Sequence, residues 1–380
     1  MEWSAELYNS YLEVNLKTLC ANYQKAKEAI GESTGIIPVL KANAYNLGDV
    51  EVANALIKQC QVEIIAVAHV TEALRLREQG IKIQILVLGA VPLTAIKEIV
   101  KYNIQLSVYT QEIIELLAKE SVSQNKKTAV QIAINSGLNR LGVRPGKSLT
   151  LVLDMLTKYK NMLEVTGVYT HLATGQEYNS PFAKEQYRIF QEAYKQVLNA
   201  GFTPRYEHIC DSGASDWFRE AYKTHVRLAR RLYMRHMETD KHFAEKYIPK
   251  EPASWRAPIL SIIKIQAGES IGYDRVFIAQ KPMRVAIIGV GYGDGMYPTM
   301  VGQKNIVLVG DTLSGYIGMC MDQSFIDVTD IPCKVGDEAT LFGYSKNGTY
   351  LSVEEVGKKA GKDGCYMLSF LTNRVKRIYI

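Results

Sequence analysis

A lysine stands where an apolar, strand-like run of the sequence ends. In IIPVLKANAYNLGD, residues 36–49, Lys41 follows five mostly apolar residues and precedes small and polar ones. A lysine amine that is partly shielded from water at a strand end has a lowered pKa and can act as a nucleophile or a base. From position alone, the simpler interpretation is a lysine that ends a strand and extends into solvent.

Two further side chains could take part in chemistry. Arg227 lies in the apolar run HVRLA, residues 225–229, at a predicted strand end, where a surface ion pair explains it poorly. Tyr273 directly follows Gly272. A phenol is a poor base near neutral pH unless cations and hydrogen bonds lower its pKa. Considered alone, Tyr273 is therefore a tyrosine in a turn.

Strand-like and helical patterns alternate over the first 245 residues. Most of the strand-like runs are apolar on both faces, as in buried parallel strands. Eight such strands alternating with helices predict an N-terminal (β/α)8 TIM barrel, with a doubly wound open sheet as the alternative. In a barrel the carboxyl ends of the strands carry the chemistry, and Lys41 stands at such an end. The candidate strands are 36–42, 63–70, 83–90, 104–110, 129–136, 165–173, 206–212 and 225–229.

Two helices between these strands have clear sequence signals. VTEALRLREQG, residues 70–80, has Thr71 as a predicted N-cap and Gly80 as a stop signal. Residues 181–201 have apolar side chains at three- and four-residue spacing and end on glycine, which is typical of an amphipathic helix.

The sequence pattern changes after about residue 245, where short strand-like runs are separated by Gly, Pro and Asp turns. One helix candidate, residues 352–361, interrupts them. This pattern predicts a separate, mostly β domain. We therefore expect a barrel domain at 10–245 and a C-terminal β domain at 246–380 that also takes in residues 1–9.

Composition excludes several classes of protein. Hydrophobic residues make up 47% and charged residues 22% of the 380, which is ordinary for a globular chain. The net charge of +6 is spread out, and the basic stretch at 225–236 is broken by apolar residues, so we expect at most a local anion site and no nucleic-acid surface. No signal peptide or apolar run long enough to span a bilayer is visible, so we expect no membrane contact.

The six cysteines stand alone in the sequence, without CxxC pairs or Cys/His spacing that would bind zinc. We therefore expect no metal site. Reduced thiols are typical of a cytoplasmic compartment, which is the predicted location.

The stretch KANAYNLG, residues 41–48, is similar to the KANAYGHG signature of the alanine racemase family, which are fold-type III pyridoxal phosphate (PLP) enzymes. Asn46 and Leu47 replace the family's Gly-His. The resemblance covers nearly the whole chain, and nine motifs in the family's order make it specific. The other eight are SGLNRLGVRP (136–145), GVYTHLAT (167–174), HICDSGAS (208–215), VRLARRLY (226–233), IGYDRVF (271–277), VGYGDGMYP (290–298), GMCMDQ (318–323) and RVKR (374–377).

The resemblance implies a racemase that interconverts L- and D-amino acids with two bases on opposite faces of PLP. Lys41 would form the Schiff base with PLP and supply one base. Tyr273, from the other subunit of a homodimer, would supply the second, with His171 as its hydrogen-bond partner. Arg227 would meet the pyridine nitrogen and disfavour its protonation, and Arg140 would lie near the phenolate oxygen.

The resemblance also assigns binding residues. Tyr45, Ser212 and backbone N–H groups around Ala229 and Arg230 would hold the phosphate of PLP. The family has glycine where Ala229 stands, and a backbone N–H survives that change if φ is negative there. For the substrate, the resemblance assigns Arg140 and two residues of the second subunit that receive the carboxylate and line the opening, Tyr292 and Met321.

Two departures from the family pattern carry information. Ala133 stands where many members have a carboxylated lysine, which holds the arginine that corresponds to Arg140. In this chain Arg140 would instead be oriented by Asn135, Asn139 or an ion.

Near the C-terminus, the family's active-site tyrosine falls on Cys365, and a shift of one residue restores Tyr366. A cysteine there would make the pocket wall smaller and admit a side chain larger than methyl.

Alanine is the default substrate of this hypothesis. Serine is a rival because of Cys365, and a basic amino acid such as lysine or ornithine is a third possibility. A decarboxylase on the related plan is disfavoured by Tyr273 and GMCMDQ. The alternative from a different class is a non-catalytic PLP-binding regulatory protein, although barrel relatives of that kind lack the β domain.

Overall fold

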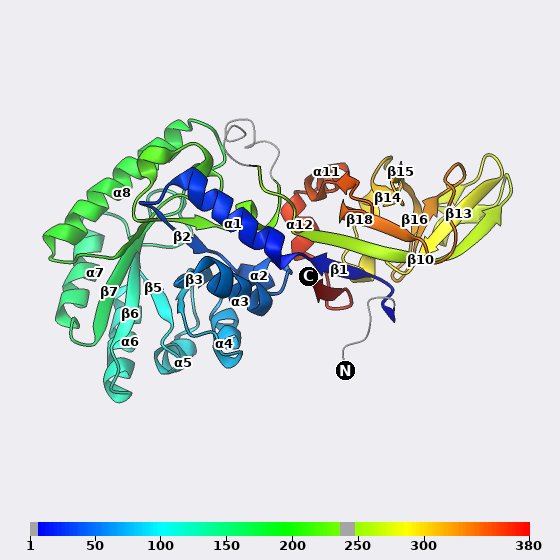
Figure 1. Cartoon of the computed structure of the whole chain (residues 1–380). Helices are drawn as coiled ribbons and strands as arrows, with labels where there is room; N and C mark the ends of the chain where they lie inside the picture. Colours follow the sequence, from blue (N-terminus) through cyan, green and yellow to red (C-terminus); the bar gives the residue numbers. More distant parts are fainter. Residues whose placement is uncertain (1–6, 236–247) are drawn as a thin grey trace.

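The computed structural model describes residues 7–235 and 248–380, and the predicted barrel fills most of the first range (Figure 1). Eight parallel strands form one sheet in the order β2-β9-β8-β7-β6-β5-β4-β3, and a bridge between Val39 and Ala66 joins its two ends. Each predicted run overlaps one strand, so the barrel is confirmed over the open sheet. The strands are β2 (Gly35–Pro38), β3 (Ile64–Val67), β4 (Gln84–Val87), β5 (Gln105–Val108), β6 (Thr128–Ala133), β7 (Leu163–Tyr169), β8 (Tyr206–His208) and β9 (His225–Leu228).

Helices cover the outside of this barrel (Figure 1). After β8 the chain instead makes two short 3-10 turns, η3 (Ala214–Asp216) and η4 (Arg219–Ala221). Among the residues that the structure describes, no helix combines the length and apolar character needed to cross a membrane. The helices are α1 (Leu16–Ile30), α2 (Lys41–Tyr45), α3 (Asp49–Cys60), α4 (Val70–Glu78), α5 (Ile96–Lys101), α6 (Gln111–Ser123), α7 (Lys147–Lys158), α8 (Pro181–Asn199) and α9 (Arg230–Tyr233).

The two helices with clear sequence signals form, with one correction. α8 buries its apolar face at the predicted three- and four-residue spacing. α4 ends near Gly80, whose φ of +82 fits the stop signal. The prediction of Thr71 as the N-cap of α4 is wrong, because His69 occupies that position and Glu72 accepts its backbone N–H at 2.9 Å. Thr71 lies inside the first turn.

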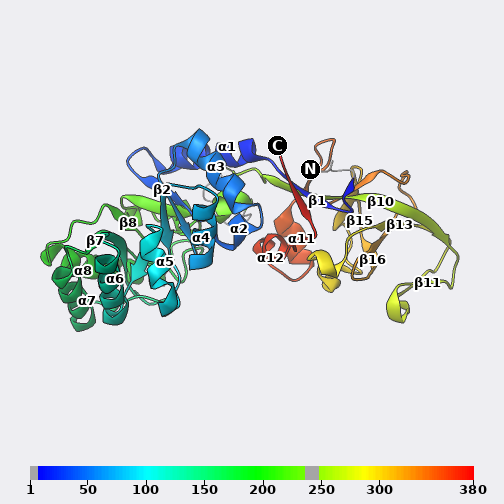
Figure 2. The same ribbon diagram turned by 90° about the horizontal axis from the view of Figure 1, so that it is seen from below.

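The C-terminal domain is mostly β, as predicted, and its main sheet is mostly antiparallel. Its central strand is β10 (Ala253–Ile265), which pairs with β13, β18 and β1. A two-stranded ribbon, β11 (Ser270–Ile271) with β12 (Phe277–Ile278), follows β10 at the end of the domain that is remote from the barrel (Figure 2). The other strands are β13 (Met283–Ile288), β14 (Val307–Val309), β15 (Thr312–Ser314), β16 (Tyr316–Met319), β17 (Ser324–Asp327), β18 (Glu338–Tyr344), β19 (Tyr350–Leu351) and β20 (Lys376–Tyr379).

The first strand of the chain belongs to this second sheet. β1 (Tyr11–Val14) pairs antiparallel with β10 and parallel with β20, so the two ends of the chain meet in one sheet. The predicted domain boundaries stay a prediction. Residues 1–6 and 236–247, on which parts of these boundaries fall, lie outside the described residues.

Two helices of the C-terminal domain lie beside the barrel (Figures 1 and 2). α11 (Val353–Lys359) lies within the predicted range of 352–361, whereas α12 (Gly364–Ser369) was not predicted. The amide of Asn46, just after α2, donates to three backbone carbonyls in and just after α12 and so joins the two domains. These carbonyls are those of Leu368 (3.0 Å), Ser369 (2.8 Å) and Leu371 (3.0 Å).

Candidate active site

A cavity of about 630 Å³ opens at the carboxyl ends of the barrel strands. This is the end of a (β/α)8 barrel at which active sites are built. Side chains at or just after the ends of β2, β6, β7, β8 and β9 converge on it. It is lined by eight of the residues singled out in the sequence: Lys41, Tyr45, Arg140, His171, Ser212, Arg227, Ala229 and Arg230.

Lys41 does not close a strand, so that part of the prediction is wrong. β2 ends at Pro38, and Lys41 begins α2, where the backbone makes a left-handed turn. The five residues from Ala42 to Asn46 all have φ between +52° and +64°. Left-handed backbone costs about 1–2 kcal/mol for each residue with a side chain, so contacts from elsewhere must hold this turn.

A carboxylate from α4 provides the main contact. One oxygen of Glu72 accepts the backbone N–H of Ala42 at 2.6 Å, and its other oxygen accepts those of Ala68 (2.8 Å) and His69 (2.9 Å). The carboxylate thus ties the turn that carries Lys41 to the loop between β3 and α4. No sequence signal assigned this role to Glu72.

Polar side chains fix the rest of the turn. Asn43 accepts the backbone N–H of Asp49 at 3.0 Å and a guanidinium N–H of Arg75 at 2.6 Å. The buried carboxylate of Asp49 pairs with the same guanidinium. Because Arg75 lies three residues after Glu72, one face of α4 supports both ends of the turn.

The surroundings of Lys41 favour a neutral amine. Burial lowers the pKa of the Lys41 amine, and the cation of Arg140 lowers it further. Nζ lies 5.7 Å from the centre of the Tyr45 ring. An amine with a lowered pKa is a better nucleophile near neutral pH than a lysine with the ordinary pKa, because more of it is unprotonated.

Arg227 crosses the floor of the cavity and is almost completely buried. Its guanidinium donates to three backbone carbonyls, those of Thr170 (2.8 Å), His208 (3.0 Å) and Ile209 (3.0 Å). Within residues 7–235 and 248–380, no carboxylate forms an ion pair with it. The site therefore holds a fixed positive charge that the carbonyl dipoles neutralise only in part.

Two neutral groups continue this network. Nδ1 of His208 lies 2.6 Å from Nη1 of Arg227, and a guanidinium can only donate, so Nδ1 accepts. Nε2–H of His208 then donates to Oε1 of Gln131 at 2.7 Å. Burial lowers the pKa of His208 well below its ordinary value, so the ring stays neutral. The network fixes the guanidinium without reducing its charge.

His171 also faces the cavity as a neutral ring. Burial lowers its pKa to about 4, although the carboxylate of Asp211 opposes that shift. Its Nδ1 lies 3.2 Å from Nη2 of Arg227 and accepts from it, which leaves Nε2–H free to donate. The only hydroxyl predicted to meet this N–H belongs to Tyr273.

Hydroxyls and backbone N–H groups gather at one side of the cavity. The hydroxyl oxygen of Ser212 accepts the N–H of Ala229 at 2.9 Å. The φ of Ala229 is −128°, so alanine fits where the family has glycine and its N–H is kept. Tyr45 and Arg230 line the same cavity, so this side offers donors that suit an anion.

Comparisons with known proteins match both domains. The family model for the alanine racemase N-terminal domain matches residues 14–235, and the family model for the C-terminal domain matches residues 253–379. The chain belongs to the alanine racemase family. Among curated relatives of the family, alanine racemase 2 of Caldanaerobacter subterraneus is 29% identical over 377 residues, which cover 99% of this chain and 96% of the relative. The alanine racemase of Clostridium tetani is 30% identical over 372 residues, 97% of this chain and 95% of the relative.

Solved structures of the family agree with the fold. An alanine racemase of Clostridium difficile superposes with a TM-score of 0.91 at 28% identity, covering 98% of this chain and 95% of that one. The alanine racemase of Bacillus anthracis, solved with bound L-Ala-P, superposes with a TM-score of 0.90 at 27% identity, covering 100% and 96%.

Three residues that the family pattern assigns to a second subunit lie on the C-terminal domain. Tyr273, in the 3-10 turn after β11, is 77% exposed, and Figure 2 shows β11 at the end of the molecule remote from the barrel. Tyr292 and Met321 are also exposed, and the N–H of Tyr292 donates to the carbonyl of Cys320 at 3.2 Å. The structure does not bring these residues into the cavity of their own chain.

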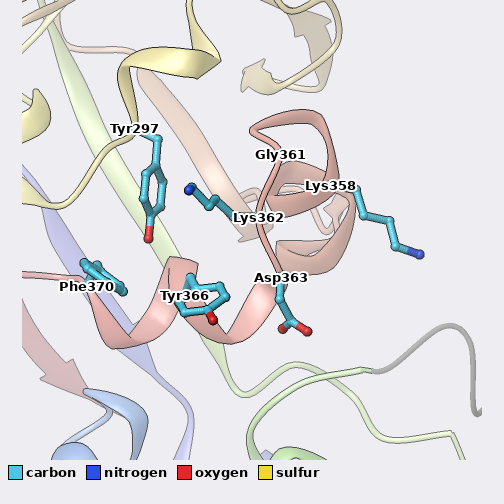
Figure 3. A pocket seen from close by; sticks show the side chains of 7 residues that line it. All are labelled: Tyr297, Lys358, Gly361, Lys362, Asp363, Tyr366 and Phe370. Atoms are coloured by element: carbon cyan, nitrogen blue, oxygen red, sulfur yellow. The ribbon is translucent and has the colours of Figure 1, made fainter. Parts of the chain in front are cut away.

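The two candidates for the pocket wall face different ways. The thiol of Cys365 lies 3.8 Å from the sulfur of Met234, and burial raises its pKa to about 12. Tyr366 instead lines a separate open pocket with Tyr297 and Phe370 (Figure 3). Cys365 is thus the residue of the pair turned toward the barrel.

The two asparagines predicted to orient Arg140 bond elsewhere, and the alternative of an ion stays a prediction. Neither Asn135 nor Asn139 forms a hydrogen bond with Arg140. The oxygen of Asn135 accepts the N–H of Asn139 at 3.2 Å, and that of Asn139 accepts from Arg144 at 3.0 Å. Ala133 ends β6 without a side chain that could reach the guanidinium. Arg140 enters the cavity from an exposed position.

Proposed function

We propose that the protein is a PLP-dependent racemase that interconverts L- and D-alanine with Lys41 and Tyr273 as its two bases. Family membership over both domains makes the chain an amino-acid racemase, an isomerase. The observation that carries the proposal is the amine of Lys41, whose pKa is lowered, in the same cavity as the fixed guanidinium of Arg227 at the catalytic end of the barrel.

The residues around the cavity fit PLP. The amine of Lys41 has the lowered pKa that suits reaction with an aldehyde, and the cation of Arg227 suits a ring nitrogen that carries no proton. The hydroxyls of Tyr45 and Ser212 suit the phosphate, and the buried Nε of Arg230 has no hydrogen-bond partner in the part of the chain that the structure describes. When bound, PLP would withdraw electrons from the α-carbon of an amino acid and so make its proton removable.

The two bases divide the proton transfers between opposite faces. Lys41 would take or return a proton at Nζ, and Tyr273 would do so at its phenol oxygen. The remote position of Tyr273 supports a shared site, in which a second copy of the chain supplies the phenol in a homodimer. The N–H of His171 would then hold the phenol oxygen, and Arg140 with the partner's Tyr292 and Met321 would receive the substrate.

Serine is the second candidate substrate, because Cys365 is turned toward the barrel. A thiol is smaller than a phenol, so a wall that Cys365 helps to form would leave room for a hydroxymethyl side chain. The six cysteines are all free, which supports the cytoplasmic location that we propose.

The test is incubation with each L-amino acid, followed by chiral chromatography. We expect D-alanine to form fastest, and Tyr273→Phe to abolish racemisation while leaving PLP binding intact. Tyr159→Phe, at a position outside the cavity, is the matched control. If Tyr273→Phe racemises alanine as fast as the unchanged chain, the two-base proposal is wrong. If the unchanged chain binds PLP and racemises nothing, it is a PLP-binding protein.

A further inference from the structure

The side chain of Arg230 is an additional cation at the anion-binding side of the cavity. It lines the cavity together with Tyr45 and Ser212, and 14% of it is exposed. Among the described residues, its one ion pair joins Nη2 to the carboxylate of Asp363, with distances of 2.9 and 3.1 Å to the two oxygens. The guanidinium therefore keeps donors that this pair does not use.

One of those donors, Nε, is buried. Nε of Arg230 is shielded from solvent and has no hydrogen-bond partner within residues 7–235 and 248–380. A buried donor without an acceptor is unfavourable, and in a cationic group it is more so. An anion at this side of the cavity could be bound by the guanidinium after a small side-chain movement.

Asp363 connects this cation to the other domain. It is the N-cap of α12, where its Oδ1 accepts the N–H of Cys365 at 2.8 Å. Figure 3 shows its carboxylate turned away from the rings of Tyr297 and Phe370, whereas the neighbouring Lys362 reaches toward Tyr297. The same carboxylate thus positions the helix that carries Cys365 and the guanidinium of Arg230.

We propose that the guanidinium of Arg230 binds the phosphate of the cofactor and that Asp363 holds it in place when no phosphate is bound. This inference rests on the proposed function, because PLP supplies the phosphate. Asp363 and the phosphate are both anions, so they compete for one cation. Cofactor retention in the barrel is thereby coupled to the first turn of α12.

The proposal predicts opposite effects for the two halves of the ion pair. Arg230→Met removes a charge-assisted contact and should weaken PLP binding about 10- to 100-fold. Asp363→Asn removes the competing anion and should leave PLP binding equal or up to about 5-fold tighter. Asparagine is as good an N-cap as aspartate, so α12 should stay intact. A purely structural bridge between domains would instead weaken binding in both variants.

The experiment compares PLP with pyridoxal, which lacks the phosphate. Each is titrated into the full chain after its cofactor has been removed, and binding is followed by the visible absorbance of the bound carbonyl compound. Arg230→Met should lose affinity for PLP and keep its affinity for pyridoxal, and Arg230→Lys should recover part of the loss. Lys362→Met removes a neighbouring charge outside the cavity and should change neither affinity.

The outcomes separate this inference from the proposed function. If the unchanged chain binds neither compound, the proposed function fails. If it binds PLP, but Arg230→Met retains the full preference for PLP over pyridoxal, only the role of Arg230 is refuted. Equal losses of PLP affinity in Arg230→Met and Asp363→Asn would also refute it. If Arg230→Met does not fold, Arg230→Lys decides, because it should show a smaller preference for PLP.

Discussion

The carboxylate of Glu72 holds the left-handed turn that carries Lys41, and Glu72→Gln tests this directly. The two carboxylate oxygens accept three backbone N–H groups, those of Ala42, Ala68 and His69. A glutamine has one acceptor oxygen and one donor nitrogen. Whichever way its amide is turned, a donor faces at least one of these N–H groups.

The expected magnitude follows from the bonds that are changed. A hydrogen bond to a charged group contributes about 1.5–3 kcal/mol, and a neutral one about 0.5–1.5 kcal/mol. Glutamine loses at least one bond and makes the remaining ones neutral. We expect the free energy of unfolding to fall by about 2–4 kcal/mol, less where water replaces the lost contact at Ala42, which is exposed.

Glu72→Gln should also slow the reaction of Lys41 with PLP in protein that stays folded. Releasing Ala42 lets a turn with five consecutive positive φ values relax, and this moves the amine of Lys41. We expect the rate at which PLP reacts with Lys41 to fall at least about tenfold in folded protein. Urea unfolding measures the stability, and stopped-flow absorbance measures the reaction.

The control for this prediction is Glu78→Gln, at the exposed end of the same helix. It removes the same charge. The free energy of unfolding should stay within about 0.5 kcal/mol, and the rate of reaction with PLP within about twofold, of the values for the unchanged chain. Equal behaviour of the two variants would refute the role of Glu72. A destabilised Glu72→Gln that still reacts with PLP at the normal rate would show that the turn does not depend on this carboxylate.

Three further predictions follow from the described contacts. Burial lowers the pKa of His171 and His208, so below pH 6.5 the unfolded chain binds more protons than the folded chain. The free energy of unfolding should therefore fall as the pH drops from 6.5 towards 5. The expected slope is up to about 1.4 kcal/mol per pH unit for each ring. Urea unfolding between pH 5 and 7 measures this slope, and a flat profile would contradict neutral burial. Cys365→Tyr should lower serine turnover relative to alanine in the chiral assay, and an unchanged ratio would mean that residue 365 does not form the wall. Asn46→Gly keeps the positive φ but removes three hydrogen bonds to the C-terminal domain, so it should cost about 2–3 kcal/mol in urea unfolding, whereas a cost near zero would show that these bonds do not hold the domains together.

The barrel could be predicted because its strands are buried on both faces. Runs such as the one at β3 (Ile64–Val67) are apolar throughout, and the helices between strands have their own period. The β1 strand could not be placed, since its partner β10 lies more than two hundred residues away along the chain and pairing over that separation leaves no local signal. α12 was missed because it is short and begins with glycine.

The site residues could be predicted from family motifs, but their support could not. The run ending at Lys41 has strand composition, and its extension to Lys41 was wrong because contacts from Glu72 and Asn46 hold a left-handed turn there. Neither contact follows from local propensity. The ion pair between Arg230 and Asp363 likewise joins residues 133 positions apart in different domains.

The central claim is that each active site combines Lys41 of one chain with Tyr273 of another, and co-expression of two inactive variants tests it most directly. Lys41→Ala and Tyr273→Phe should each be inactive alone. In a mixed dimer, one site regains both intact residues and the other has neither. A one-to-one mixture contains about half mixed dimers, so it should show about a quarter of the unchanged activity. Activity no greater than the sum of the two separate variants, in mixed dimers shown to form, would contradict the shared site.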